Sequence, residues 1–74
     1  MKIIVNSALM GDQIIDALTS YNNDNVKYEF VSKLGMRIEL EVTEMDKTTA
    51  IDLTKKIIRS QDFGSALYFQ VITL

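Results

Sequence analysis

The chain of 74 residues contains no cysteine, no histidine, no proline and no tryptophan. Without cysteine it can form no disulfide and no thiolate site, and without histidine it lacks a common ligand for zinc and copper. Histidine is also the usual general base for a nucleophilic serine, so the serines of this chain have no such partner. These absences predict a protein without a metal site, a cofactor or catalytic residues.

Charge and hydropathy exclude two further classes of partner. The formal net charge is −2 and the isoelectric point is about 4.9, so no broad positive field attracts nucleic acid. No apolar run reaches the roughly 18 residues of a membrane span. The beginning, MKIIVNSALM, resembles a signal peptide, but its apolar run breaks at Asn6 and Ser7 and no small-residue cleavage site follows. We therefore expect a cytoplasmic protein with no nucleic-acid or membrane partner.

Because the chain is small, association with a second copy would help to stabilise its fold. Residues 1–74 are expected to form one domain, near the lower limit for a self-sufficient core. Hydrophobic residues make up 47% of the chain, which is ordinary for a globular protein. Since disulfides and metals are excluded, packing alone must stabilise the fold, and oligomerisation is a common remedy for a small core.

Hydrophobic patterning predicts four strands. Residues 2–6 (KIIVN) and 66–74 (ALYFQVITL) are apolar on both faces, as in buried strands. Residues 26–32 (VKYEFVS) and 36–43 (MRIELEVT) alternate between apolar and polar side chains, as in strands with one buried face.

The two alternating strands are expected to form a hairpin. A two-residue loop at Leu34-Gly35 would set Val31 against Ile38 and mix the apolar and polar faces, so we reject it. A three-residue loop at residues 33–35 instead sets Phe30 against Ile38 and keeps the apolar pairs on one side. Such loops favour a left-handed last residue, and Gly35 occupies that position.

A helical period over residues 47–61 predicts the second helix, with its apolar and charged side chains on opposite faces. Asp46 is its expected N-cap, and Gly64 its expected terminator. Between the first helix and the second strand, residues 22–25 (NNDN) form the one linker-like cluster of the sequence.

The first helix has two possible starts in residues 6–15 (NSALMGDQII). If Ser7 (or Asn6) is the N-cap, the helix begins at Ala8, and Gly11 lies on its apolar face and lets it approach the sheet closely. If Asp12 is the N-cap, the preceding residues form a loop whose amides could bind a ligand. We favour the first start because the apolar spacing extends back to Met10.

The resulting order, strand-helix-strand-strand-helix-strand, resembles the ferredoxin-like split βαβ fold. This resemblance implies an α+β sandwich: a four-stranded antiparallel sheet in the order 4-1-3-2, with two helices on one face. It covers the whole chain but is only topological, because no family motif accompanies it.

Several functions known on this fold lack their residues here. Acyl-phosphate hydrolysis uses an arginine in the loop after the first strand, whereas the first arginine of this chain is Arg37. Metal chaperones use a pair of cysteines in the same loop. RNA-binding versions display aromatic residues on the central strands, where this chain carries Arg37, Glu39 and Glu41. An enzyme or an RNA-binding protein is therefore not expected.

The open face of the sheet carries the predicted interface. Its apolar part is formed by Ile4 on the first strand and by Tyr68, Gln70, Ile72 and Leu74 on the last. Clustered exposed apolar side chains usually mark an interaction site. The last strand is also a sheet edge without proline or lysine, the residues that usually prevent edge pairing. We therefore predict a small non-catalytic protein-interaction module that forms a homodimer through this face or this edge.

A small-ligand-binding regulatory domain is the alternative function. Regulatory domains of this fold bind amino acids at the first loop, which places a weaker candidate ligand site at Ser7, Gly11 and Asp12. No arginine or lysine stands within this stretch to support a phosphate site.

Overall fold

The computed structural model describes residues 1–23 and 25–74. Along the chain, the elements are β1 (Lys2–Asn6), α1 (Gly11–Ser20), β2 (Asn22–Asn23), β3 (Val26–Leu34), β4 (Arg37–Val42), α2 (Lys47–Arg59), the 3-10 turn η1 (Gly64–Ala66) and β5 (Gln70–Thr73). In the NNDN cluster, two residues thus belong to β2, and Asp24 lies outside the described residues.

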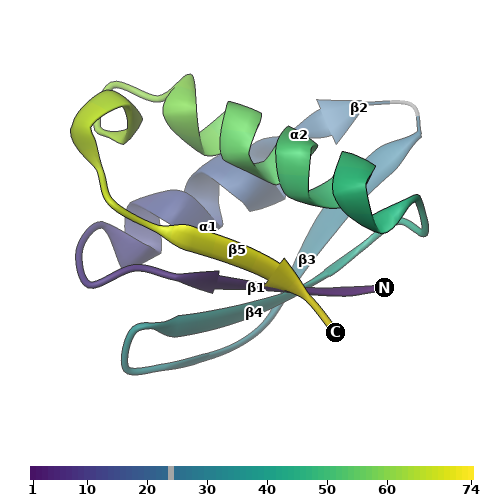
Figure 1. The fold of residues 1–74 in the computed structure, drawn as a ribbon, viewed down its shortest axis with the longest axis horizontal. Helices are drawn as coiled ribbons and strands as arrows, with labels where there is room; N and C mark the ends of the chain where they lie inside the picture. Colours follow the sequence, from purple (N-terminus) through teal and green to yellow (C-terminus); the bar gives the residue numbers. More distant parts are fainter. Residues whose placement is uncertain (24) are drawn as a thin grey trace.

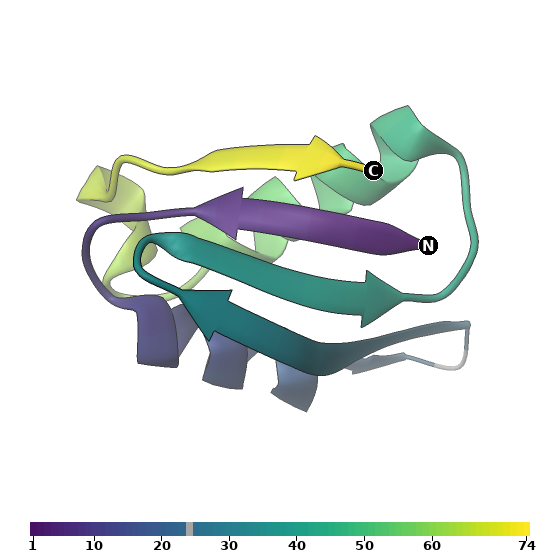
Figure 2. The same cartoon turned by 90° about the horizontal axis from the view of Figure 1, so that it is seen from below.

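The strands form one sheet in the order β2-β3-β4-β1-β5, and each neighbouring pair is antiparallel. The four longer strands have the predicted order 4-1-3-2, and the short β2 is added beside the beginning of β3. Both helices cover one face of this sheet and leave the other open (Figures 1 and 2). The ferredoxin-like α+β fold is therefore confirmed. Among the described residues, no helix has the length and apolar character needed to cross a membrane.

The core lies between the sheet and the two helices. The central strands β1 and β4 contribute alternate residues to it, such as Ile3, Val5 and Leu40, which are fully buried. From the helices, Leu18 of α1 and Ile58 of α2 are also fully buried. The period of two in the strands and the helical spacing thus direct apolar side chains to one shared layer.

The hairpin between β3 and β4 differs from the prediction. Its loop has two residues, Gly35 and Met36, and Gly35 has a φ of 60°, which suits the first position of a two-residue turn. Phe30 is opposite Leu40 instead of Ile38, and the register then shifts at Val31 in a β-bulge. The predicted loop had one residue more than the observed loop. The bulge adds one residue within β3 instead, so the apolar pairs still lie on one face.

The predicted start of the first helix is wrong. α1 begins at Gly11, and its N-cap residue Met10 has a left-handed backbone with a φ of 62° and no capping side chain. Ser7 does not cap the helix, because its Oγ donates to the carbonyl of Leu9 at 2.6 Å and its N–H donates to the carbonyl of Met36 at 3.0 Å. The second bond holds the chain beside the hairpin for one residue beyond β1, which delays the turn into the helix.

The second helix begins as predicted but ends differently. The carboxylate of Asp46 accepts hydrogen bonds from the N–H groups of Thr48 and Thr49, at 3.1 and 3.3 Å. Ser60 is the C-cap of α2, so Gly64 does not terminate the helix. Gly64 instead begins the turn η1 and is buried against the last turn of α2.

Candidate interaction surfaces

The strand β5 is a free edge of the sheet. β1 is its one strand neighbour among the described residues (Figure 2). The N–H of Leu74 donates to the carbonyl of Lys2 at 3.2 Å. Because neighbouring residues of a strand direct their backbone groups to opposite sides, Val71 and Thr73 direct their N–H and C=O groups away from β1. These groups are available to a further strand.

The side chains on the open face of this edge are large and uncharged. Tyr68 is 80% exposed, Leu74 is 60% exposed and Ile72 is 44% exposed. Gln70 is also exposed, and its Nε2 donates to the hydroxyl of Tyr68 at 3.3 Å. No charged residue occurs from Tyr68 to the last residue, Leu74. A partner strand would therefore meet apolar contacts and no charge on β5.

Ile4 departs from the sequence prediction. Its side chain lies on the open face, opposite Glu39 and Ile72, but it is 0% exposed. Beside it, Lys2 Nζ and the carboxylate of Glu39 form an ion pair at 3.1 Å. Ile4 is thus covered by its own neighbours and cannot contact a partner directly. The predicted interface therefore loses Ile4 and keeps its residues from Tyr68 to Leu74.

The opposite edge of the sheet is protected. Strand β2 pairs with the first two residues of β3, and the bulge at Val31 interrupts the regular edge beyond them. β3 also carries Lys27, Glu29 and Lys33. Short covering strands, bulges and charged side chains are the usual defences of sheet edges. β3 combines a covering strand, a bulge and charged side chains, whereas β5 is short but carries no charged residue.

The three residues of the alternative ligand site lie together at the first turn, and the side chains of Ser7 and Asp12 have partners within the protein. The hydroxyl and N–H of Ser7 are bonded within the protein, and the residue is buried. Asp12 forms an ion pair with Lys33 at 3.3 Å. The same lysine covers Gly11, where an added Cβ would lie 2.9 Å from Lys33 Cε and 3.7 Å from Ile38 Cδ1. The predicted close approach of Gly11 to the sheet is therefore present, and Lys33 lies over the turn.

A second group of exposed apolar side chains lies where this turn meets the hairpin loop. The two loops are joined by the bond from Ser7 N–H to the carbonyl of Met36. The exposed side chains are those of Leu9, Met10, Leu34 and Met36. Sequence patterning does not predict this group, because Leu9 and Met10 were expected in a helix and a bond between distant loops brings them to Leu34 and Met36. We refer to these four residues as the end patch.

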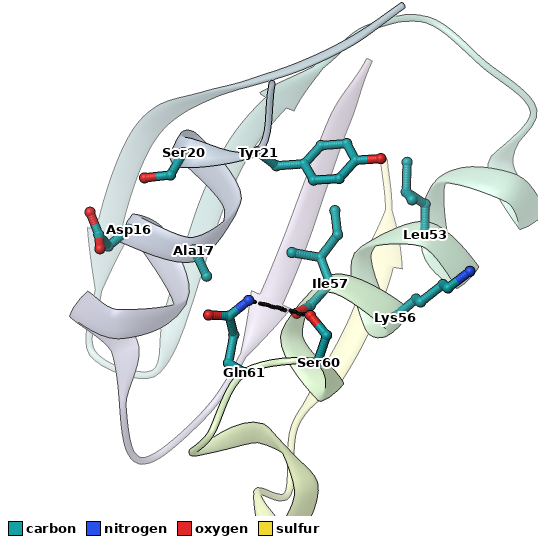
Figure 3. A pocket seen from close by; sticks show the side chains of 9 residues that line it. All are labelled: Asp16, Ala17, Ser20, Tyr21, Leu53, Lys56, Ile57, Ser60 and Gln61. Carbon is teal, nitrogen blue, oxygen red and sulfur yellow. Dashed lines mark hydrogen bonds between the residues drawn. The ribbon is translucent and has the colours of Figure 1, made fainter. Parts of the chain in front are cut away.

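A groove of about 470 Å³ lies between α1 and α2 (Figure 3). Ala17 of α1 directs only a methyl group into the space between the helices. Its polar atoms largely bond one another: Ser60 Oγ donates to the carbonyl of Ile57 at 2.7 Å, and Gln61 Nε2 approaches both at 3.3 Å.

The charged residues at the rim of the groove do not converge on it. Asp16 belongs to α1 and Lys56 to α2, and Figure 3 shows both side chains directed outward from the two helices. Within residues 1–23 and 25–74, no three acidic side chains gather as metal ligands would. The edge strand β5, with its outward backbone groups and exposed apolar side chains, is therefore the best candidate for a binding surface.

Scans against protein-family models, curated proteins and solved structures gave no match to this chain. The fold is thus known by its topology, and its function must be argued from its own surfaces.

Proposed function

We propose that this chain is a cytoplasmic, non-catalytic protein-interaction module that self-associates through the edge strand β5. One observation carries the proposal: β5 is an uncharged sheet edge whose outward N–H and C=O groups at Val71 and Thr73 have no neighbouring strand. Addition of a strand to such an edge is a common mode of protein recognition.

A second copy is a suitable occupant because of the charge distribution. Two β5 strands can approach each other without opposing like charges, which would destabilise a cross-strand pair. The other sheet edge would bring together the charged residues Lys27, Glu29 and Lys33 of two copies. Because of the defences on that edge, β5 is the better suited of the two described edges for pairing.

Pairing at the edge is also favoured over stacking through the open face. That face contains the ion pair of Lys2 with Glu39 and the exposed carboxylates of Glu29 and Glu41. Burying these groups would remove their hydration, which the existing pairs recover only in part. Edge pairing leaves them in water.

The expected association is weak. β5 has four residues, so the contact is smaller than the roughly 1,200–2,000 Å² of stable interfaces. We expect a dissociation constant of about 10 μM or weaker. Equilibrium sedimentation or light scattering at concentrations up to about 1 mM should show a dimer that dissociates on dilution.

Substitution at the edge should abolish this dimer. We expect Ile72→Glu and Leu74→Glu to keep the chain monomeric, because each replaces an apolar contact at the edge with a carboxylate that pairing would remove from water. Circular dichroism verifies that each variant is folded. Leu34→Glu is the matched control, since Leu34 is 81% exposed but lies in the end patch. A wild type that is monomeric at 1 mM, or a dimer lost only in Leu34→Glu, would contradict the proposal.

A further inference from the structure

The edge strand also indicates how the two copies are arranged, an inference that rests on the proposed function. We propose that the two β5 strands pair antiparallel about a two-fold axis at Val71. In this register Val71 is opposite Val71 of the partner subunit, and Tyr68 is opposite Leu74 of the partner subunit. The two sheets then join into one continuous sheet, with the helices of both copies on the same face.

Backbone alternation restricts the possible registers. The bond from Leu74 N–H to Lys2 fixes which groups of β5 face its neighbour β1. The groups facing outward in β5 are those of Val71 and Thr73. Phe69, one residue before the strand, joins them when pairing extends the strand by one residue.

Hydrogen-bonded pairs between copies must therefore join outward residues with outward residues. Three compact two-fold registers meet this condition, with Gln70, Val71 or Ile72 on the axis. The Gln70 axis would set Leu74 against Ala66 of the partner subunit, which belongs to the turn η1 and not to a strand, so the choice lies between Val71 and Ile72.

Overlap distinguishes the two registers. With Val71 on the axis, the seven residues from Tyr68 to Leu74 are covered from end to end, and about six backbone hydrogen bonds can form. With Ile72 on the axis, about four can form, and Tyr68 extends beyond the end of the partner strand. The first register therefore makes fuller use of the uncharged segment.

Side-chain contacts favour the same register. Tyr68 and Leu74 are the most exposed apolar residues of the segment, and the Val71 axis sets each against the other across the pair. Side chains directly opposite each other across a strand pair contact one another, and such contacts stabilise a sheet. Gln70 is then opposite Ile72 of the partner subunit, on the open face.

Disulfide formation between introduced cysteines can identify this register directly, because the chain has no cysteine of its own. We expect an equimolar mixture of Gln70→Cys and Ile72→Cys, oxidised slowly at high concentration, to form mainly the mixed disulfide. Residues opposite each other in a non-hydrogen-bonded pair have Cα atoms about 4.5 Å apart, which is within disulfide reach. Intact mass spectrometry distinguishes the mixed dimer from the two homodimers.

Three outcomes would separate failure of the register from failure of the proposed function. A predominance of the Ile72→Cys homodimer would place the axis at Ile72 and overturn the register while keeping the edge interface. A random ratio of about 1:2:1, equal to that of a control mixture with Leu34→Cys, would show no ordered pairing at β5. A wild type that is monomeric by sedimentation would overturn both proposals.

Discussion

We expect Gly64→Ala to lower the free energy of unfolding by about 3 kcal/mol or more. A Cβ at this position would overlap the carbonyl oxygen of Ile58 and would lie 2.7 Å from its carbonyl carbon and 3.1 Å from Cα of Arg59. All these atoms belong to the backbone of α2, so no side-chain rotation can relieve the clash. The loss is a large share of the roughly 4–11 kcal/mol available to a chain of this size. Urea unfolding followed by circular dichroism measures it.

The other two glycines serve as controls for this prediction. At Gly11 an added Cβ would meet the flexible end of Lys33, which can move away, so Gly11→Ala should change stability by less than about 0.5 kcal/mol. Gly35 has a left-handed φ of 60° with open space around it, and Gly35→Ala should cost about 1 kcal/mol. A Gly64→Ala protein as stable as Gly35→Ala would contradict the close packing of η1 against α2.

The position of Gly64 also bears on the interface. Nη1 of Arg59 lies 3.3 Å from the carbonyl oxygens of Gly64 and Leu67, and its guanidinium carbon lies 4.8 Å from the centre of the Phe69 ring. Arg59 thus connects the end of α2 to the segment that leads into β5. The orientation of the edge strand therefore depends on this close contact between the turn and the helix.

Periodicity was sufficient to predict the type of the long elements and their order along the chain, and the resemblance to the ferredoxin-like fold supplied the order of the strands in the sheet and the face that the helices cover. Alternation in β4 and helical spacing in α2 each determine which side chains are buried, and these choices agree across the fold. Local geometry was harder to predict. Either a bulge at Val31 or a longer loop keeps the apolar side chains of the hairpin on one face of the sheet. The sequence does not show which of the two forms.

The start of α1 and the exposure of Ile4 depend on contacts between distant residues. Ser7 is held by the hairpin carbonyl of Met36, a bond that no local capping rule contains, so Ser7 cannot act as the predicted N-cap. Ile4 lies on the predicted face, but Glu39 and Ile72 on neighbouring strands cover it. Strand patterning predicts the face of a side chain, and its exposure depends on the size of the neighbours.

A second large effect is expected in the core, where Tyr28 and Thr54 form a buried hydrogen-bond chain. Thr54 Oγ1 donates to the carbonyl of Ala50 at 2.8 Å, so the Tyr28 hydroxyl, 2.9 Å away, donates to Thr54. We expect Thr54→Val to lower the free energy of unfolding by about 1–3 kcal/mol, because it preserves the side-chain shape but leaves a buried hydroxyl without a partner.

The reverse change should be milder. Tyr28→Phe removes one hydrogen bond but leaves Thr54 bonded to Ala50, so we expect a loss of about 0.5–1.5 kcal/mol. The double variant should lose less than the sum of the two single losses, because it leaves no unpaired hydroxyl at this place. Urea unfolding of the four proteins gives the coupling energy. Additive losses would show that the two hydroxyls act independently.

Alkaline pH provides a second readout of the same pair. Burial raises the pKa of the Tyr28 hydroxyl above its ordinary value of 10.0, because the phenolate would lose its hydration. This contribution to stability is therefore complete below the ordinary value and is lost as the pH rises through the raised pKa. We expect the wild type to lose stability above pH 10 more steeply than Tyr28→Phe, which lacks the titrating group. Equal pH dependence of the two unfolding free energies would show that this hydroxyl is accessible to water.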